Sequence, residues 1–493
     1  MARKTTLNAA NLEALGAERL AGLLMELAGG DAAIKRRLRL ELAGNQGPGE
    51  IAREIRKRLA AIARSRSFLE RGRLRPLVND LQTQRRAITG PLAASDPPAA
   101  LDLMWRFLAL ADPTLGRCDD SDGAVSAVFE EAVADLARIA PAASPDPRRL
   151  ADETFTALGS DGYGVFHGLI RALAPALGTE GLAHIEQRMT ALSREPVPTP
   201  PEEEREVIAW GTHGVIYADE IERRARENTV SRALAEIADR RGDVDGFIAQ
   251  YDEKMRSLPE IAAGIARRLV AAGRPGDALE AIEAATRPDR GFRREVWEMN
   301  GAEVELEDAR IEVLEALGRT DDAQAVRWSC FERFLSASHL RAHLQRLPDF
   351  DDVEAERRAL ETVERLESLV GALAFLTGWP ALDRAAALLL RRADELDGDW
   401  YEILTPAAEA LAGRHPLAAT LLLRSMIDFA LQRKRSARYR HAARHLESCR
   451  GLASFIGDFG DFEPHEAYVA RLQAEHGRKY SFWEEVAENA AGG

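Results

Sequence analysis

The chain has 493 residues, of which 46% are hydrophobic and 30% are charged, a balance typical of a folded protein and not of a disordered one. Its net charge of −14 disfavours indiscriminate binding of nucleic acid by the whole chain. Leu, Ala, Arg and Glu dominate, while β-branched residues are sparse and period-two alternation is hard to find. The composition therefore predicts an all-α fold.

Three features bear on the compartment. Cys118, Cys330 and Cys449 are widely spaced and form no CxxC motif, which indicates a reducing environment. The N-terminus starts with basic residues but lacks the apolar core of a secretory signal. The longest apolar stretch, residues 369–379, is too short and too interrupted by glycine to span a bilayer. These features predict a cytoplasmic protein.

Helices separated by Gly, Pro, Asp or Asn are predicted along almost the whole chain. Near the N-terminus, one helix ends at Gly29 and Gly30, and Asp31 is the expected N-cap of the next helix, which ends at Gly44. Further on, Pro97 stands just inside a helix start, where its missing N–H costs nothing.

The segment from Lys35 to Arg86 is strongly basic. It carries fifteen Lys and Arg against five acidic residues, so its charge is about +10 and that of the remaining chain about −24. An apolar stripe that begins at Ile51 leaves most of the cations facing solvent. The tentative anion-binding or nucleic-acid-binding set is Arg53, Arg56, Lys57, Arg58, Arg64, Arg66, Arg71, Arg73 and Arg75.

Another interpretation of the same segment is a solvated face that pairs with acidic surface of this chain, such as residues 349–356, or that joins two copies head to tail. Phe68 is the sole aromatic residue nearby, so base stacking is not expected. A second basic helix, residues 431–446, offers Tyr439 as a stacking residue.

A glycine-rich stretch, residues 159–178, opens a predicted helix. Its backbone N–H groups could hold a phosphate, but neither a preceding strand nor a Lys-Ser/Thr pair supplies the context of a nucleotide-binding loop. The favoured interpretation is a turn between helices with Asp161 as the N-cap.

Proline-rich breaks divide the chain. The strongest is residues 193–205, where several prolines precede an acidic run and no helix can cross. We therefore predict a basic N-terminal helical region (1–92), a middle helical region (93–195) and an α-solenoid (203–493).

The third region contains a repeated turn. Aligning Gly273 with Gly318 also aligns leucines, arginines, aspartates and alanines around them, the alanines being Ala278 and Ala323. Gly413 and Ala418 form a third copy. Glycine permits a left-handed turn, and the small alanine allows two helices to pack closely. This spacing resembles the tetratricopeptide repeat, which implies a helix-turn-helix array.

The array is expected to be irregular. The units start at uneven intervals, and a degenerate unit at residues 376–392 has Ala385 two positions late relative to its glycine. The large apolar position of the unit is Ile282 or Leu422 in two copies but Arg327 in the middle one, so the face of the middle copy must differ.

The C-terminal part is similar to a large, uncharacterised family of bacterial helical proteins, in which a related segment follows SWIM-type zinc fingers. The N-terminal stretch fits the same family. A SWIM finger needs a CxC pair and a later Cys-x-His, and this chain has neither, so the resemblance implies an α-helical fold and no zinc-finger function. The matching residues are Arg438, Tyr439, Ala442, Ala443, Leu446, Tyr468, Leu472, Glu475, His476, Arg478, Lys479 and Phe482.

His441, His445 and Cys449 are weak metal-ligand candidates, since they share one helix face at intervals of four residues. The outer two lie about 12 Å apart along a helix axis, too far for one tetrahedral ion without ligands from elsewhere. The favoured interpretation is a packed helix face and no metal. His339 and His343 have the same spacing and no further ligand nearby.

No HExxH, GxSxG, P-loop or paired-carboxylate motif occurs, so neither an enzyme nor a cofactor is predicted. The favoured function is a scaffold or adaptor that binds a partner protein or peptide on a helical-repeat surface. The alternative is a nucleic-acid-associated protein that uses residues 35–86. The tentative partner-binding residues are Trp297, Trp328, Trp379 and Trp400.

Overall fold

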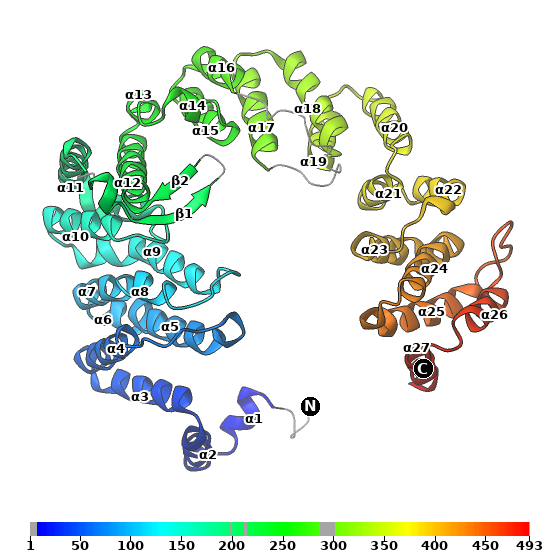
Figure 1. The fold of residues 1–493 in the computed structure, drawn as a ribbon, viewed down its shortest axis with the longest axis horizontal. Helices are drawn as coiled ribbons and strands as arrows, with labels where there is room; N and C mark the ends of the chain where they lie inside the picture. The colour runs from blue at the N-terminus through cyan, green and yellow to red at the C-terminus, as the bar shows by residue number, and fades with distance from the viewer. Residues whose placement is uncertain (1–6, 198–199, 212–213, 286–300, 493) are drawn as a thin grey trace. The chain divides into compact units, whose positions relative to one another are not determined.

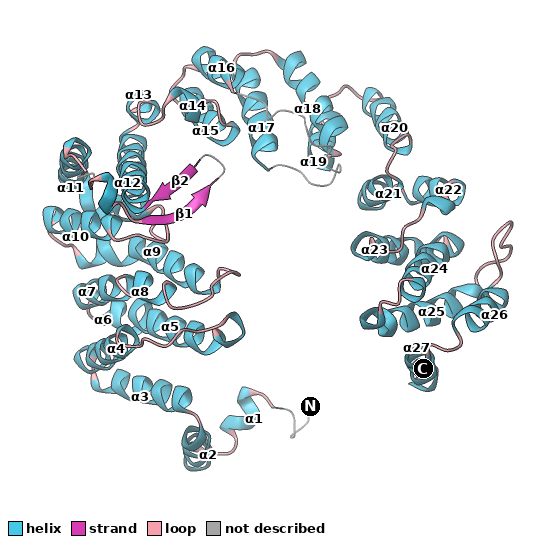
Figure 2. Ribbon diagram, viewed as in Figure 1, coloured by secondary structure: helices cyan, strands magenta, loops and turns pink. Residues whose placement is uncertain are grey.

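The computed structural model describes residues 7–197, 200–211, 214–285 and 301–492. The predicted partner-binding residue Trp297 lies outside the described residues. The chain divides into two compact units, Met1–Glu253 and Lys254–Gly493. Helices form nearly all of the regular structure in both units (Figures 1 and 2). The all-α prediction is confirmed.

Unit 1 is a succession of helices with one small hairpin near its end. Its elements are α1 (Ala9–Glu13), α2 (Ala17–Gly30), α3 (Ala32–Gln46), α4 (Pro48–Ala63), η1 (Arg71–Arg73), α5 (Arg75–Ala87), η2 (Ile88–Leu92), α6 (Ala93–Ser95), α7 (Pro97–Leu108), α8 (Ala111–Leu115), α9 (Ala124–Ala143), α10 (Pro147–Gly159), α11 (Leu169–Arg194), η3 (Glu202–Glu204), β1 (Val207–Gly211), β2 (Gly214–Tyr217), α12 (Ala218–Arg241) and α13 (Val244–Ile248). The short helix α14 (Glu253–Arg256) follows at the boundary.

One hydrophobic core runs through unit 1, from Ala43 to Ile237. It forms because successive helices turn their apolar stripes toward one another: α7 and α5 pack on α9, and α11 packs on α9, α10 and α12. The core draws residues from each of the three regions that the sequence predicts, and the division into compact units falls at residue 253. Whether the three regions are separate domains stays a prediction.

The hairpin follows the proline-rich break and was not anticipated. β1 pairs antiparallel with β2 in a register that places Trp210 opposite Val215. Arg205 holds its base, since the guanidinium donates to Asp219 at 3.0 and 3.1 Å and lies 3.7 Å from the ring centre of Tyr217. Trp210 remains 80% exposed.

Unit 2 is a helical-repeat array. Its elements are α15 (Pro259–Ala271), α16 (Pro275–Ala284), α17 (Gly301–Ala316), α18 (Thr320–Phe334), α19 (Ala337–Leu344), α20 (Asp351–Glu364), α21 (Leu369–Gly378), α22 (Leu382–Arg391), η4 (Ala393–Glu395), α23 (Tyr401–Ala412), α24 (Pro416–Gln432), η5 (Ser436–Arg438), α25 (Tyr439–Ala453), α26 (His465–His476) and α27 (Tyr480–Gly492). Consecutive helices pack on one another through most of this series.

The predicted repeat turn is present twice with the same geometry. Gly273 and Gly318 both have φ +74, a left-handed conformation that L residues rarely adopt. In each case the next amide, of Arg274 or Arg319, donates to a carbonyl five residues back, at 2.8 and 2.9 Å, which closes the helix C-terminus. The same arginines pair at 2.6 Å with Asp277 and Asp322.

The alanines of the repeat turn pack as expected. Ala278 and Ala323 are completely buried, and the large apolar residue Ile282 is only 1% exposed. These positions bring each second helix close to the first, so the helix-turn-helix prediction is confirmed for α15–α16 and α17–α18.

Two expectations about the other units were wrong. Gly413 has φ −74, so the turn before α24 is not left-handed. That turn closes instead through the amide of His415, which donates to the carbonyl of Leu411 at 2.8 Å. Ala385 is not displaced either. The turn before it closes through the carbonyl of Leu376, and Ala385 follows Leu376 by the same number of residues as Ala278 follows Leu269, whose carbonyl closes the first turn. Ala385 is also completely buried.

A hydrophobic core of unit 2 extends from Phe331 to Phe482 and includes the apolar residues on which the C-terminal resemblance depends, such as Tyr439 and Tyr468. Among the helices that the structure describes, none is both long enough and apolar enough to cross a membrane.

Candidate functional site

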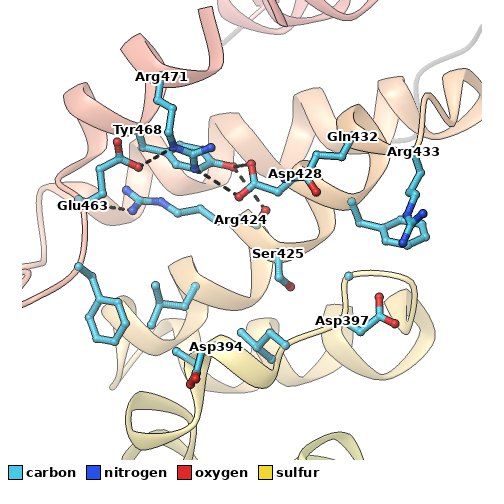
Figure 3. A pocket seen from close by; sticks show the side chains of 16 residues that line it. Asp394, Asp397, Arg424, Ser425, Asp428, Gln432, Arg433, Glu463, Tyr468 and Arg471 are labelled. Atoms are coloured by element: carbon cyan, nitrogen blue, oxygen red, sulfur yellow. Dashed lines mark hydrogen bonds and ion pairs between the residues drawn. The ribbon is translucent and has the colours of Figure 1, made fainter. Parts of the chain in front are cut away.

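A cleft of about 640 Å³ opens along α24 in unit 2. One wall is the stretch from Ala393 to Gly398, and another runs from Phe462 into α26 (Figure 3). The charged residues that line this α24 cleft are Asp394, Asp397, Arg424, Asp428, Arg433, Glu463 and Arg471. The mixture of charged and aromatic lining residues makes it a candidate binding site.

Arg424 is buried although it carries a charge. It stands in the apolar run of α24, between Leu423 and Met426, and only 5% of it is exposed. Its Nη1 donates to the backbone carbonyl of Glu463 at 2.5 Å, and its guanidinium lies 4.4 Å from the ring centre of Tyr468. Its Nε and Nη2 have no hydrogen-bond partner among the described residues. Burial lowers the pKa of Arg424.

Arg471 forms hydrogen bonds with the two carboxylates whose negative charge also reaches Arg424. It donates to Glu463 at 3.1 Å and to Asp428 at 3.3 Å (Figure 3). The Tyr468 hydroxyl donates to the other oxygen of Asp428 at 3.2 Å. Burial raises the pKa of Asp428, and burial also raises the pKa of Tyr468 well above its ordinary value. Within the described part of the chain, Arg424 forms no ion pair of its own.

Gly398 sets the width of the cleft. A Cβ added there would lie 2.1 Å from the carbonyl oxygen of Ser425 and 2.8 Å from the Cα of Met426. Only a residue without a side chain lets this wall touch the backbone of α24. The loop Asp397–Gly398 is therefore held directly against the helix that carries Arg424.

A smaller cavity of about 230 Å³ also borders Gly398, and His441 and His445 line it with Tyr401 and Met426. Burial lowers the pKa of His445 to about 4, with His441 as a second, smaller cause. Cys449 instead points into the core, where its Sγ approaches the carbonyl of Thr420 at 3.9 Å.

The weak metal candidates are thus divided between two environments. Burial raises the pKa of Cys449 to about 12, so its thiol stays protonated and is a poor metal ligand. Across the described ranges, no group of three His, Cys, Asp or Glu residues could hold a metal ion.

The predicted partner-binding tryptophans are half-buried. Trp328, Trp379 and Trp400 all pack against the core of unit 2. Arg358 lies over the ring of Trp328 at 5.1 Å and Arg341 over that of Trp379 at 4.8 Å, so cations cover these two rings. Whether the tryptophans contact a partner stays a prediction.

The basic set of unit 1 divides into paired and unpaired residues. Arg53, Arg56, Arg58 and Arg71 form ion pairs with acidic residues of the same unit. The described residues supply no ion pair to the other five, Lys57, Arg64, Arg66, Arg73 and Arg75, and all five are exposed. Phe68 lies in the same stretch and is 64% exposed.

The glycine-rich stretch contains the predicted turn between helices, but the prediction of Asp161 as the N-cap was wrong, because α11 begins after Gly168. Asp161 accepts hydrogen bonds from the amides of Val165 and Phe166 at 2.8 and 3.0 Å. The N-terminus of α11 is already occupied, since Glu236 accepts from the amides of Gly168 and Arg171 at 3.2 and 3.3 Å.

His339 and His343 serve packing. His339 is buried and bonds Asp308 at 2.9 Å through Nε2. His343 bonds the carbonyl of Gln324 at 3.2 Å and lies against the ring of Trp328. Burial lowers the pKa of His343.

Sequence reasoning missed the α24 cleft. Its lining residues span from Ala393 to Arg471, and no motif joins residues so distant along the chain. One local signal was available: Arg424 interrupts a run of apolar residues in a helix that is otherwise buried on several sides. A charged residue in such a position needs either a partner or a function.

Comparison with known proteins identifies the family. Residues 2–485 match the family described as "Family of unknown function (DUF6880)". No curated protein matches the chain. A solved structure, "Circular tandem repeat protein with novel repeat topology and enhanced subunit contact surfaces", matches at 16% identity over 92% of this chain and 94% of that one, with a TM-score of 0.15. The family match covers nearly the full length, and the chain belongs to the DUF6880 family.

Proposed function

We propose that this protein is a non-enzymatic scaffold of the bacterial cytoplasm that binds a peptide segment of a partner protein in the α24 cleft. The observation that carries the proposal is the cleft itself, about 640 Å³ in volume and lined by α24, by residues of α26 and by the stretch from Ala393 to Gly398 within a helical-repeat array. Clefts of this volume are typical of ligand sites, and repeat arrays commonly present such surfaces to partners. Cys118, Cys330 and Cys449 are all free and buried, which supports a reducing compartment.

An affinity capture with a matched variant tests the proposal. The tagged chain is incubated with native lysate, with and without nuclease, beside Asp394→Lys, a charge reversal at the cleft rim. We expect a defined partner that survives nuclease and is depleted in the variant. Glu409→Lys is the control, because Glu409 is exposed on the neighbouring α23 and does not line the cleft. A partner set unchanged by Asp394→Lys would contradict the proposal.

A specific observation favours a second function, binding of nucleic acid by the basic set. Five of its cations are exposed without an ion pair in the described chain, and Phe68 is exposed among them. Phosphate contacts release counterions, so affinity would fall steeply with salt. Bound material that disappears after nuclease treatment, together with weaker binding of a duplex by Arg64→Gln/Arg66→Gln, would support this function over the first.

A further inference from the structure

Arg424 is the unusual residue of the α24 cleft. A buried guanidinium is normally paired with a carboxylate, because the loss of its hydration is otherwise uncompensated. Here the backbone carbonyl of Glu463 and the rings of Tyr468 and Phe459, whose centres lie 4.4 and 5.7 Å from the guanidinium, meet the cation, and its Nε and Nη2 have no partner among the described residues. Both nitrogens belong to the edge of a guanidinium that binds a carboxylate with two parallel hydrogen bonds.

The neighbouring carboxylates of Glu463 and Asp428 do not form ion pairs with Arg424. Arg471 holds Glu463 and Asp428, and Tyr468 donates to Asp428 as well. These hydrogen bonds hold both carboxylates on Arg471 and Tyr468 and not on Arg424. No carboxylate of the described chain is therefore left to pair with Arg424.

The charge of the cleft selects a single negative charge. Three arginines line it against four carboxylates, Asp394, Asp397, Asp428 and Glu463. A dianionic phosphate would add two charges to walls that are already slightly negative, whereas one carboxylate neutralises one guanidinium. A planar carboxylate also matches the planar fork of Arg424.

The opposite wall indicates a second feature of the ligand. Asp394 and Asp397 are both exposed on the stretch that Gly398 holds against α24, and the described residues supply no cation to either of them. A ligand with a carboxylate at Arg424 therefore gains from a positive group that reaches this acidic rim.

We propose that the α24 cleft binds a peptide carboxylate, held by Arg424, next to a Lys or Arg side chain that faces Asp394 and Asp397. The carboxylate is either a peptide C-terminus or an Asp or Glu side chain. This inference rests on the proposed scaffold function and assigns the chemistry that its cleft recognises.

Two libraries of random hexapeptides test it on the full chain. One library ends in a free carboxylate and the other in an amide, and the retained peptides are measured by fluorescence anisotropy. We expect retained peptides that combine a carboxylate with Lys or Arg. Retention from the free-acid library alone identifies a C-terminus, and retention of Asp or Glu peptides from both libraries identifies a side chain.

Variants separate recognition from folding. Arg424→Gln is expected to weaken the best peptide by at least about thirtyfold, since a buried charged partner is lost. Arg424→Lys keeps the positive charge but lacks the planar fork of the guanidinium. Its affinity for the peptide should lie between that of the unchanged chain and that of Arg424→Gln. Asp394→Lys should weaken binding by about three- to tenfold, and Glu409→Lys should change nothing. Each variant is first shown to unfold cooperatively.

Three results would overturn the inference: unchanged affinity in a folded Arg424→Gln, displacement of the peptide by inorganic phosphate at lower concentration than by acetate, or no retention from either library. The scaffold proposal is tested separately, because a partner captured from lysate and lost in Asp394→Lys would stand even if every hexapeptide failed.

Discussion

Two buried arginines of unit 2 occupy contrasting surroundings. Arg327, in α18, is 3% exposed. It pairs with Glu315 of α17 and donates to Gln324 at 3.0 Å. Arg424, in α24, is buried almost as deeply, but no carboxylate of the described residues forms an ion pair with it. Arg327 takes the repeat position that is apolar in two other copies, and Arg424 interrupts an apolar run of α24.

The difference separates a structural charge from an available one. In the α17–α18 pair, the chain provides the counter-ion, and Arg346 adds a second contact to Glu315 at 3.3 Å. Around α24, the same chain commits its carboxylates to Arg471. Burial alone therefore says little about function, whereas burial without a partner is informative.

The largest expected effect comes from the cleft wall. Gly398→Ala places a Cβ against backbone atoms of α24, which cannot yield like a side chain. We expect a loss of about 3 kcal/mol in the free energy of unfolding, measured by denaturant titration. Gly451→Ala is the control, because nothing lies within 4 Å of its added Cβ. An equal effect in both variants would refute the close contact.

Removing the partner of Arg327 should make it resemble Arg424. Glu315→Ala leaves a buried cation with less compensation, and we expect a loss of about 2 kcal/mol, moderated because Glu315 is partly exposed. Adding Arg327→Leu, the residue type found at the equivalent position of α24, should restore most of the loss. A double variant no more stable than Glu315→Ala would show that the ion pair is not the cause.

Acid should weaken the α24 region through His445. Its folded-state pKa of about 4 lies below the ordinary value of 6.5, so protonation favours the unfolded chain. The stability it contributes is complete above pH 6.5 and is lost as the pH falls toward 4, by about 1.5 kcal/mol after allowance for partial exposure. His445→Leu should flatten this part of the stability profile, and His167→Leu, at an exposed histidine of unit 1, should not.

The same substitution should have opposite signs at the two arginines. Arg424→Met removes an uncompensated charge and is expected to raise ligand-free stability by about 1 kcal/mol. Arg327→Met breaks a satisfied pair and should lower stability by a similar amount. Thermal unfolding of both variants without ligand measures this, and a loss in both would contradict the contrast.

The smallest expected effect on stability concerns the turns that precede α18 and α24. Gly318→Ala forces φ +74 on an L residue and should cost about 1 kcal/mol. Gly413→Ala, at φ −74, should cost nothing measurable. Equal losses would mean that the two turns do not differ in the way their dihedral angles indicate.

Local features of the fold could be read from the sequence, whereas the cleft could not. The turn at Gly273 and its copy at Gly318 were predictable because left-handed closure, a small alanine and helical periodicity are short-range requirements. The place of Ala385 in its unit could not be read from the nearest glycine, because the carbonyl that closes this turn belongs to Leu376. The hairpin of β1 and β2 could not be predicted from the sequence, because two short strands show little alternation of apolar and polar residues.

The site was beyond sequence reasoning for a different reason. Arg424 shows as a charge in an apolar helix, but its lack of a carboxylate depends on where Arg471 directs Asp428 and Glu463. Such an absence is a property of packing among elements that are distant along the chain.

The two compact units also bear on how the protein melts. The large core from Ala43 to Ile237 belongs wholly to unit 1, and that from Phe331 to Phe482 belongs wholly to unit 2. Cores that share no residues need not lose their structure together, so a calorimetric scan should show more than one cooperative event. A single melting temperature would then average the unfolding of two different units. A substitution at α24 would shift the unfolding of unit 2, and the unfolding of unit 1 would serve as an internal reference.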